Sequence, residues 1–233
     1  MSLLQEYGIS CVTVKSVNVY LIRTGNGIVV FDAGPKDSAS RIMRQIEKGG
    51  YGHDDVKLII ISHSHNDHFS GASELRELTG APVAAHPLDA PYIEAGRNPE
   101  VQITENLSTD VIKFINEKAG KQFPPCKVDI RMDRNFDPAD FSLTGKIVET
   151  PGHTYGSVSY ILNDIALTAD ILTSRLMEPN TPRIPMFAYD INEIFKSIKK
   201  ILSYDVKCLY PSHGGCFTFD SVNAFIKRES ETE

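Results

Sequence analysis

The stretch that decides the interpretation of this chain is residues 56–68, VKLIIISHSHNDH. Its apolar first part, Val56–Ser62, has the length of a strand and predicts one that is buried on both faces of a sheet. Three histidines and one aspartate follow. In an extended segment His63 and His65 project to the same side, whereas Asp67 and His68, just past the strand, can turn toward a second ion. Open α/β sheets place ligands at the carboxyl ends of strands, so we expect a metal site here.

Three further donors follow predicted strands in the same way. His153 comes directly after one strand, Asp170 ends another, and His213 ends the last. Five of the seven histidines and two aspartates therefore lie at the carboxyl ends of strands. Neutral imidazole and carboxylate are ligands that suit zinc and its neighbours. Three imidazoles per ion with shared carboxylates make a dinuclear hydrolytic site, which is the site that we predict.

The pattern of apolar residues divides the chain into two halves of similar order. Each half runs from strands to a helix to another strand, which suggests two layers of sheet with helices outside. Asp37 is expected to cap the first helix, and Asp190 with Glu193 forms a capping-box pattern before another. The predicted strands are 11–23, 28–31, 56–62, 82–85, 146–150, 157–162, 165–169 and 206–212, and the predicted helices begin at 37, 70, 190 and 219.

Residues 86–144 differ from the two halves because six prolines interrupt them. One helix is predicted within this stretch, over Glu105–Lys118. The stretch is too short and too broken to hold a core of its own. We therefore interpret it as an insertion that wraps an edge of a single domain, residues 1–233, and expect it to include a cover over the metal site that helps to set substrate choice.

Composition excludes several classes of function. The chain has 233 residues, 41% of them hydrophobic, and a net charge of −6 without a basic tract, so we expect no nucleic-acid partner. No apolar run approaches the roughly 20 residues of a membrane helix, and residues 1–10 lack the pattern of a secretory signal. The four cysteines form no C-x-x-C pair, which makes a disulfide scaffold improbable and a cytoplasmic location the expectation.

The four motifs around the donors together resemble the metallo-β-lactamase superfamily. They are H-x-H-x-D-H at 63–68, P-G-H at 151–153, T-A-D at 168–170 and S-H-G at 212–214. The resemblance extends from the turn Asp32-Ala33-Gly34 to His213 and implies an α+β fold, a four-layer αββα sandwich with the metals at one edge between the sheets. It implies that His63, His65 and His153 bind the first metal, that Asp67, His68 and His213 bind the second, that Asp170 bridges both, and that Asp32 supports the histidine-rich loop.

The resemblance also implies a class of reaction. Zinc β-lactamases that act on antibiotics generally lack an Asp at the bridging position, whereas thioesterases similar to glyoxalase II, lactonases and phosphodiesterases have one. Two divalent ions, Zn²⁺ first with iron or manganese as alternatives, would activate a shared hydroxide, and Asp67 could receive a proton during breakdown of the intermediate. We therefore expect hydrolysis of a small ester or thioester. The 20 residues after His213 are fewer than the helical region with which larger relatives grip glutathione.

Several alternatives remain open. Lactone and phosphodiester hydrolysis are close competitors, although Thr173 stands about where homoserine-lactone hydrolases often have Tyr. A mononuclear iron oxygenase that acts on persulfides uses part of the same ligand set, and a metal-binding protein without turnover is a third class. Tyr155 and Tyr189 are candidates for the substrate pocket. We interpret the remaining singled-out residues, His53, His86 and Cys216, as structural.

Overall fold

Nearly every residue of the central strand β4 (Val56–Ile61) is buried, on both faces of its sheet. Leu58 and Ile60 face one apolar core, whereas Ile59 and Ile61 face another. Because successive side chains of a strand point to opposite sides of a sheet, this sheet separates two cores, and the predicted strand with two buried faces is confirmed. The structure is a computed structural model and describes residues 2–100, 102–104, 121–175 and 177–230.

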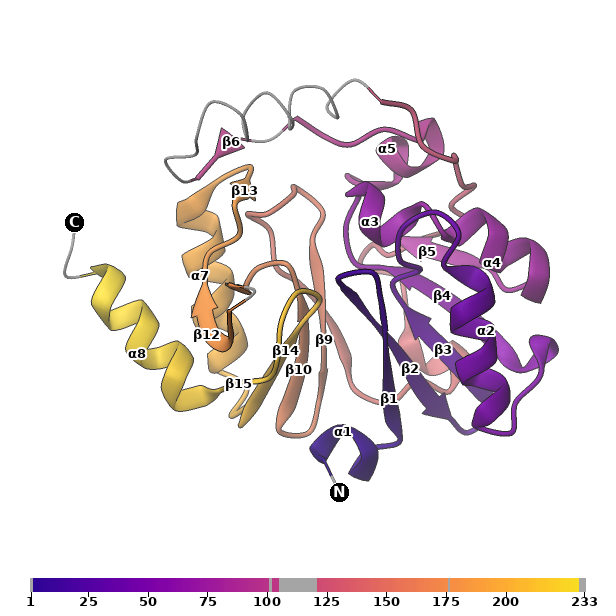
Figure 1. Cartoon of the computed structure of the whole chain (residues 1–233), viewed down its shortest axis with the longest axis horizontal. Coiled ribbons are helices and arrows are strands. Elements are labelled where there is room, and N and C mark those ends of the chain that lie inside the picture. The colour runs from indigo at the N-terminus through magenta and orange to yellow at the C-terminus, as the bar shows by residue number, and fades with distance from the viewer. Residues whose placement is uncertain (1, 101, 105–120, 176, 231–233) are drawn as a thin grey trace.

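Two sheets form the middle of the molecule (Figure 1). Strand order is β1-β2-β3-β4-β5-β7 in the first sheet and β15-β14-β10-β9-β8 in the second. The first sheet comprises Ile9–Val14, Val17–Thr24, Gly27–Phe31, Val56–Ile61, Val83–Ala85 and Ile130–Arg131. The second, in chain order from β8, comprises Lys146–Glu149, Val158–Leu162, Ile165–Ala169, Cys208–Pro211 and Phe217–Thr218. The predicted hairpin over 157–169 is confirmed, since β9 pairs with β10 in antiparallel fashion.

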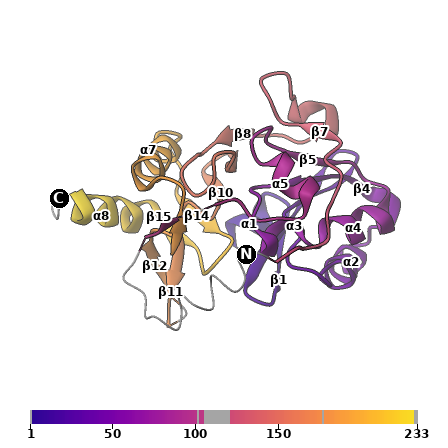
Figure 2. The ribbon, with the colours of Figure 1, turned by 90° about the horizontal axis from the view of Figure 1, so that it is seen from above.

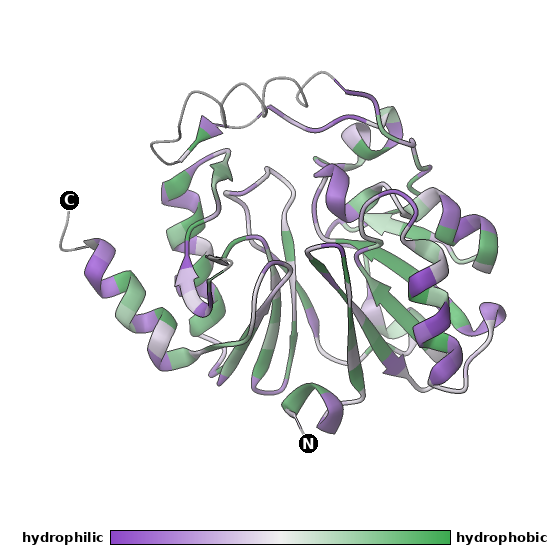
Figure 3. Cartoon of the chain, in the orientation of Figure 1, coloured by the Kyte–Doolittle hydropathy of each residue, from purple (hydrophilic) through white to green (hydrophobic). Residues whose placement is uncertain are grey.

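Helices cover the outer face of each sheet, which gives four layers (Figures 1 and 2). Their apolar faces close the two outer cores, and the strands are mostly hydrophobic while polar residues mark the outer sides of the helices (Figure 3). The expected α+β sandwich of αββα type is confirmed. The covering helices are α2 (Ala39–Lys48), α4 (Ala72–Thr79), α7 (Ile191–Leu202) and α8 (Phe219–Ser230), and the short helices are α1 (Leu3–Glu6), α3 (Asn66–Phe69), α5 (Ala90–Ala95), η1 (His53–Asp55) and η2 (Pro138–Phe141).

The predicted first strand, residues 11–23, is two strands. β1 and β2 meet in a turn at Lys15 and Ser16, where Lys15 takes a φ of 57°. Valines occupy positions 12 and 14 and then 17 and 19, so the alternation changes phase across the turn. That change of phase is the sequence signal of a two-residue hairpin turn.

Two predicted helix caps differ from the prediction. Asp37 does not cap α2, because it takes a left-handed φ of 69° in the preceding turn and Ser38 stands next to the helix instead. Asp190 does cap α7, and it accepts hydrogen bonds from the N–H groups of Asn192 and Glu193 at 2.8 and 3.2 Å. The capping box is not completed by Glu193, because the N–H of Asp190 donates to the Gly152 carbonyl instead, at 2.9 Å. This bond fastens α7 to the turn that carries His153.

The helix predicted from residue 70 begins later and is preceded by a separate turn of helix, α3. The break falls at Gly71, whose Cβ, if it had one, would lie 2.3 Å from the Ala33 carbonyl oxygen. The N–H of Gly71 donates to the Gly34 carbonyl at 3.0 Å. Close approach of these two backbones requires glycine and holds α3 against the end of β3.

The stretch 86–144 reaches three places in its described parts. Residues 86–98 lie over the carboxyl end of β5, and β6 (Gln102–Ile103) pairs with β13 (Phe187–Ala188) near the turn that carries His153. Farther along, β7 adds to the edge of the first sheet beside β5. The predicted helix over Glu105–Lys118 lies outside the described residues, and the role of this stretch as a cover stays a prediction.

A ribbon of two strands, β11 (Thr173–Arg175) and β12 (Glu178–Arg183), is not foreseen in the sequence. Pro179 and Pro182 lie in β12 and argue against a strand within a larger sheet. A two-stranded ribbon leaves one side of each strand unpaired, so it tolerates prolines there.

Among the described residues, no helix combines the length and the hydropathy that a bilayer crossing requires. All four cysteines are free thiols.

A buried hydroxyl joins the two sheets. The phenol of Tyr20, on β2, donates to the Pro211 carbonyl on β14 at 2.7 Å. We expect Tyr20→Phe to lower the free energy of unfolding by about 1 kcal/mol because it removes this bond, and Tyr20→Ala by about 3–5 kcal/mol because it also leaves a cavity. Urea unfolding at fixed metal content measures both. Tyr51→Phe, at a half-buried position, is the control, and an equal loss in Tyr51→Phe and Tyr20→Phe would contradict the assignment.

Candidate metal centre

The ends of five elements bring the seven predicted donors to one edge of the sandwich, the upper edge in Figure 1. The loop after β4 carries His63 and His65, and the following α3 carries Asp67 and His68. The second sheet supplies the others, His153 from the turn between β8 and β9, Asp170 after β10 and His213 after β14. Because β10 and β14 are parallel neighbours, their carboxyl ends deliver Asp170 and His213 side by side.

The donors form three overlapping groups in which the potential ligand atoms lie within 4.8 Å of one another. The histidine cluster is His63, His65 and His153; the central group is His63, His68 and Asp170; and the mixed cluster is Asp67, His68 and His213. The resemblance to the superfamily implied the first and the third as two metal sites, with Asp170 between them.

Asp170 is the centre of the arrangement. Its Oδ2 lies 3.4 Å from Nε2 of both His68 and His213, 3.6 Å from Nε2 of His153 and 4.0 Å from Nε2 of His63. The Asp170 side chain is only 8% exposed. One carboxylate oxygen therefore faces four imidazole nitrogens that come from both clusters.

The other ring nitrogen of these histidines is held by an acceptor. Nδ1 of His153 lies 2.7 Å from the Phe187 carbonyl and Nδ1 of His213 lies 3.0 Å from the Ser16 carbonyl. A carbonyl oxygen only accepts, so Nδ1 of each ring carries a hydrogen and Nε2 is the nitrogen that faces Asp170. Nδ1 of His68 is held likewise by the Asp32 carboxylate at 2.9 Å.

Buried polar atoms without a hydrogen bond converge on this point. Within the described residues they include Nε2 of His63, His68 and His153 and Oδ1 of Asp170. Leaving such an atom unsatisfied costs about 1–3 kcal/mol. Cations bound by lone pairs of neutral imidazole and by carboxylate oxygen would satisfy all four atoms, so the residues present fit a metal centre.

Asp32 contacts the histidine-rich loop, for which the resemblance implied a supporting role. It is fully buried and takes a φ of 67°, a strained conformation for a residue with a side chain. Its carboxylate accepts hydrogen bonds from the backbone N–H and the hydroxyl of Ser62 at 2.8 and 2.9 Å, from Nδ1 of His68 at 2.9 Å and from the Ser212 hydroxyl at 3.3 Å. The residue thus ties the loop of the first sheet to the end of β14 next to His213.

Burial keeps the histidine cluster neutral. It lowers the pKa of His63 well below the ordinary value and that of His65 to about 3, and nearby imidazoles act in the same direction. Burial also lowers the pKa of His153, although the Asp170 carboxylate opposes the shift. All three rings therefore offer lone pairs at neutral pH.

Charge dominates in the mixed cluster. Burial alone would lower the pKa of His68, but Asp170, Asp32 and Asp67 raise it well above the ordinary value. Burial also opposes the shift of His213, whose pKa Asp170 and Asp67 raise to about 8. Burial would raise the pKa values of the two carboxyls Asp67 and Asp170, but the neighbouring imidazoles hold both well below the usual range.

The group of seven donors is exposed to solvent on one side. The side chains of His63 and His68 are fully buried, whereas those of His213 and Asp67 are 24% and 37% exposed. Nε2 of His213 lies 3.2 Å from Oδ2 of Asp67. A molecule in solution therefore reaches the centre past this pair.

The remaining singled-out residues lie elsewhere. Tyr155 and Tyr189 stack with ring centroids 3.5 Å apart, and Tyr155 is exposed. His53 contacts the Leu78 carbonyl and His86 pairs with Glu149 at 3.3 Å, away from the seven donors. The thiol of Cys216 lies beside Cys208, and burial raises the pKa of Cys216 to about 12, so it is a protonated thiol at neutral pH.

Asp89 is the residue near the centre that sequence reasoning missed. It is 1% exposed and contacts both histidine-bearing loops, through Ser64 and Thr154. The only signal for it is its position four residues after β5, at the same edge of the sheet as the donors. No motif marks this carboxylate among the 30 acidic residues of the chain.

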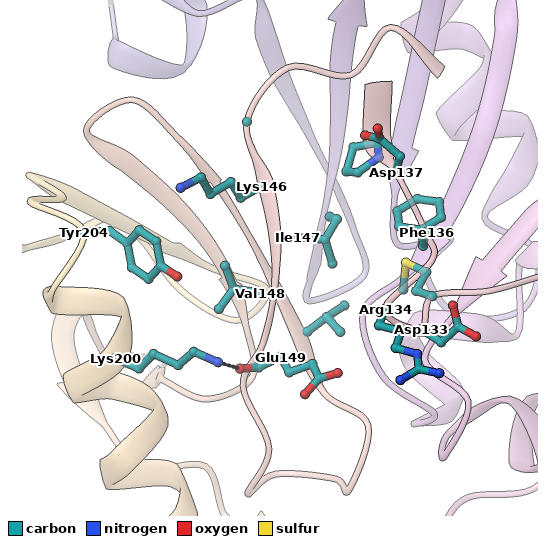
Figure 4. Close-up of a pocket in the computed structure, with 14 residues that line it drawn as sticks. Asp133, Arg134, Phe136, Asp137, Lys146, Ile147, Val148, Glu149, Lys200 and Tyr204 are labelled. Carbon is teal, nitrogen blue, oxygen red and sulfur yellow. Dashed lines mark hydrogen bonds between the residues drawn. The ribbon is translucent and has the colours of Figure 1, made fainter. Parts of the chain in front are cut away.

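Two cavities are candidates for a ligand. One, of about 440 Å³, adjoins the loops of the centre and is lined by Pro91, Tyr92, Ala95, Arg97, Asn98, Glu100 and Tyr155. The other, of about 540 Å³, lies between the segment after β7, strand β8 and helix α7 (Figure 4). Lys200 donates there to the Glu149 carbonyl at 2.9 Å, and none of the seven donors lines this cavity.

Comparison with known proteins agrees with this fold. A family model described as the metallo-beta-lactamase superfamily matches residues 12–213. The probable metallo-hydrolase YflN of Bacillus subtilis is 27% identical over 229 residues, which cover 89% of this chain and 84% of that protein.

Two further relatives are more distant. The hydroxyacylglutathione hydrolase of Cereibacter sphaeroides is 25% identical over 165 residues, which cover 67% of this chain and 51% of that protein. The crystal structure of BJP-1, a subclass B3 metallo-beta-lactamase of Bradyrhizobium japonicum, superposes with a TM-score of 0.63 at 24% identity, over 88% of this chain and 75% of that one. The structural likeness shows the fold.

Asp170→Ala tests the centre. Because Asp170 Oδ2 faces imidazoles of both clusters, its loss should lower the bound metal below that of the parent and reduce kcat/KM by at least about 100-fold, or about 2.8 kcal/mol. Cys216→Ala is the control and should leave metal content unchanged. Metal analysis and kinetics on the same preparations measure both effects. Full metal content and normal turnover in Asp170→Ala would mean that Asp170 only ends its strand.

Proposed function

The chain belongs to the metallo-beta-lactamase superfamily, and from that premise we propose that it is a metallo-hydrolase that cleaves a small ester or thioester with two metal ions. The observation that carries the proposal is the single Asp170 oxygen within 4.0 Å of four imidazole nitrogens. Such a carboxylate suits a bridge between two ions, with the histidine cluster holding one and the mixed cluster the other. Zn²⁺ fits this set of nitrogen and oxygen donors.

Two divalent cations supply Lewis acidity when bound and lower the pKa of a coordinated water toward about 7, which makes hydroxide available at neutral pH. The protein's own groups orient the imidazole rings and accept protons. Asp67 is ionised at neutral pH, reaches solvent and pairs with His213, so it is placed to accept a proton as the substrate breaks down. The backbone carbonyls behind His153 and His213 keep the ring hydrogens on Nδ1.

Two observations support an ester or thioester, and the first of them argues against a β-lactam only. The site has a hard oxygen donor, Asp170, at its centre. One distant relative is a hydroxyacylglutathione hydrolase, whose name describes cleavage of an acylated glutathione. With a net charge of −6, the protein suits a small-molecule substrate better than a nucleic acid.

We propose that the cavity of about 440 Å³ binds the part of the substrate that does not react. Asn98 joins it to the centre, because its side-chain oxygen accepts the N–H of Asn66 at 2.8 Å, and Asn66 lies between His65 and Asp67. Tyr155 forms another wall two residues after His153. Cavities with aromatic walls and a few polar groups are typical small-molecule sites.

A panel of substrates tests the reaction. Protein loaded with zinc, manganese or iron is assayed on a thioester, an ester, a lactone, a phosphodiester and a β-lactam, with metal content measured in parallel. We expect two ions per chain and the highest kcat/KM on the thioester or the ester. Preference for the lactone or phosphodiester would overturn the substrate class. A single iron with oxygen consumption on a persulfide would overturn hydrolysis itself.

Tyr155→Ala tests the cavity. Loss of the ring should raise KM by about 2- to 12-fold, which corresponds to about 0.5–1.5 kcal/mol for an aromatic contact, with little change in kcat. Tyr155→Phe, which keeps the ring, should stay close to the parent. Metal content should be unchanged in both variants. A fall in kcat with constant KM would place Tyr155 outside the binding contacts.

A further inference from the structure

A buried carboxylate outside the donor set joins the two loops that carry the histidine cluster. Asp89 precedes α5 and is 1% exposed. Its Oδ2 accepts hydrogen bonds from the backbone N–H of Ser64 at 2.7 Å and from the hydroxyl of Thr154 at 2.7 Å, and its Oδ1 accepts the N–H of Gly156 at 2.8 Å. Both oxygens are thus engaged, and the three donors belong to two loops that lie far apart in the sequence.

These donors are neighbours of the histidine cluster. Ser64 lies between His63 and His65, and Thr154 directly follows His153. The three histidines of that cluster are therefore all adjacent in sequence to a group that Asp89 holds. The rings of His65 and His153 pack edge to face, with centroids 4.4 Å apart.

Asp32 occupies the corresponding place on the other side. It contacts His68 directly and Ser212, the residue before His213, which are the two histidines of the mixed cluster. The described residues thus contain two buried carboxylates of similar use, Asp89 at the histidine cluster and Asp32 chiefly at the mixed cluster. Asp32 also reaches the start of the histidine-rich loop through Ser62.

The surroundings of Asp89 leave little freedom. A Cβ on Gly156 would lie 2.8 Å from Oδ1 of Asp89 and 2.7 Å from Nδ1 of His86. Thr154 is held from the other side, because its N–H donates to the hydroxyl of Ser157 at 3.0 Å. The position of Asp89 therefore fixes the separation of the two loops.

We propose that Asp89 is the positioning residue of the histidine cluster: by tying the loop of His63 and His65 to that of His153, it sets the affinity of this cluster for its metal ion, separately from the mixed cluster. This inference rests on the two-metal site of the proposed function. Carboxylates that orient ligands typically contribute 10- to 100-fold to metal affinity.

A carboxylate suits this place better than an amide. All three partners donate, and an ionised carboxylate offers only acceptors. In Asp89→Asn one oxygen becomes an NH₂ group, which then faces either the Gly156 N–H or the pair of donors from Ser64 and Thr154. At least one of the three hydrogen bonds is lost while the size of the side chain is kept.

The experiment measures metal affinity rather than turnover. Metal-free parent and Asp89→Asn are titrated with Zn²⁺ against a chromophoric chelator. The parent should bind two ions. Asp89→Asn should bind one ion as the parent does and the other about 10- to 100-fold more weakly. Crystals grown with one equivalent of Zn²⁺ should then show anomalous density among Asp67, His68 and His213 and little among His63, His65 and His153.

Two further variants guard against a simple folding defect. Thr154→Val removes one of the three bonds and should weaken the same ion to a smaller extent. Gly156→Ala keeps the carboxylate but pushes it away, and should resemble Asp89→Asn. Asp129→Asn is the matched control, because Asp129 accepts from Arg76 and from the Val83 N–H away from the centre, and it should bind both ions as the parent does.

The outcomes separate this inference from the proposed function. Equal weakening of both ions in Asp89→Asn, or no weakening, overturns the positioning role, and so does anomalous density that persists in the histidine cluster. Selective loss of that ion supports the role even if no substrate of the panel is hydrolysed, in which case only the proposed function fails.

Discussion

The arrangement of this molecule depends on one electrostatic constraint, the Asp170 carboxylate among four imidazoles at the junction of the two sheets. The group is almost fully buried, and three of the nitrogens around it make no hydrogen bond within the described residues. Apolar packing cannot satisfy such atoms, whereas cations in their midst would. The sandwich around them supplies the rigidity that keeps the nitrogens converging.

Hydrogen bonds from surrounding residues hold the donors in place on this rigid sandwich. Backbone carbonyls of Phe187 and Ser16 hold two of the rings, and they belong to segments that have no donor of their own. Asp32 and Asp89 accept hydrogen bonds from the loops that carry the histidines. Tyr20 and its bond to Pro211 join the sheets just beneath. Each contact connects a residue of one layer to a loop of another, so the geometry of the centre belongs to the whole fold.

The two sides of the centre differ in their relation to solvent. The histidine cluster lies in the interior, where desolvation keeps its rings neutral. The mixed cluster borders water at Asp67 and His213, where carboxylates favour charge on the imidazoles. Since a ligand has to be deprotonated to bind metal, a cation bound at the mixed cluster would displace protons from its imidazoles, whereas the rings of the histidine cluster are already neutral.

The sequence by itself determined most of the central strands and covering helices, and which donor side chains follow the strands. Apolar alternation and turn residues mark the central strands, and the spacing of His63, His65, Asp67 and His68 after one strand indicates a metal site because these contacts are local in the chain. The assignment of Asp170 as a bridge came from the resemblance to the superfamily and not from spacing, since it depends on the packing of a second sheet against the first.

Only the tertiary structure decided which groups hold the donors. Asp89 has no motif, and its three partners lie 25, 65 and 67 residues away. The sequence predicts the cap at Asp190. It does not predict that the Asp190 N–H donates to the Gly152 carbonyl, because Gly152 lies in another element. Local pattern encodes strand, turn and side-chain type. The partner of a buried polar group is set by where distant backbones meet, and that is decided when the two sheets pack.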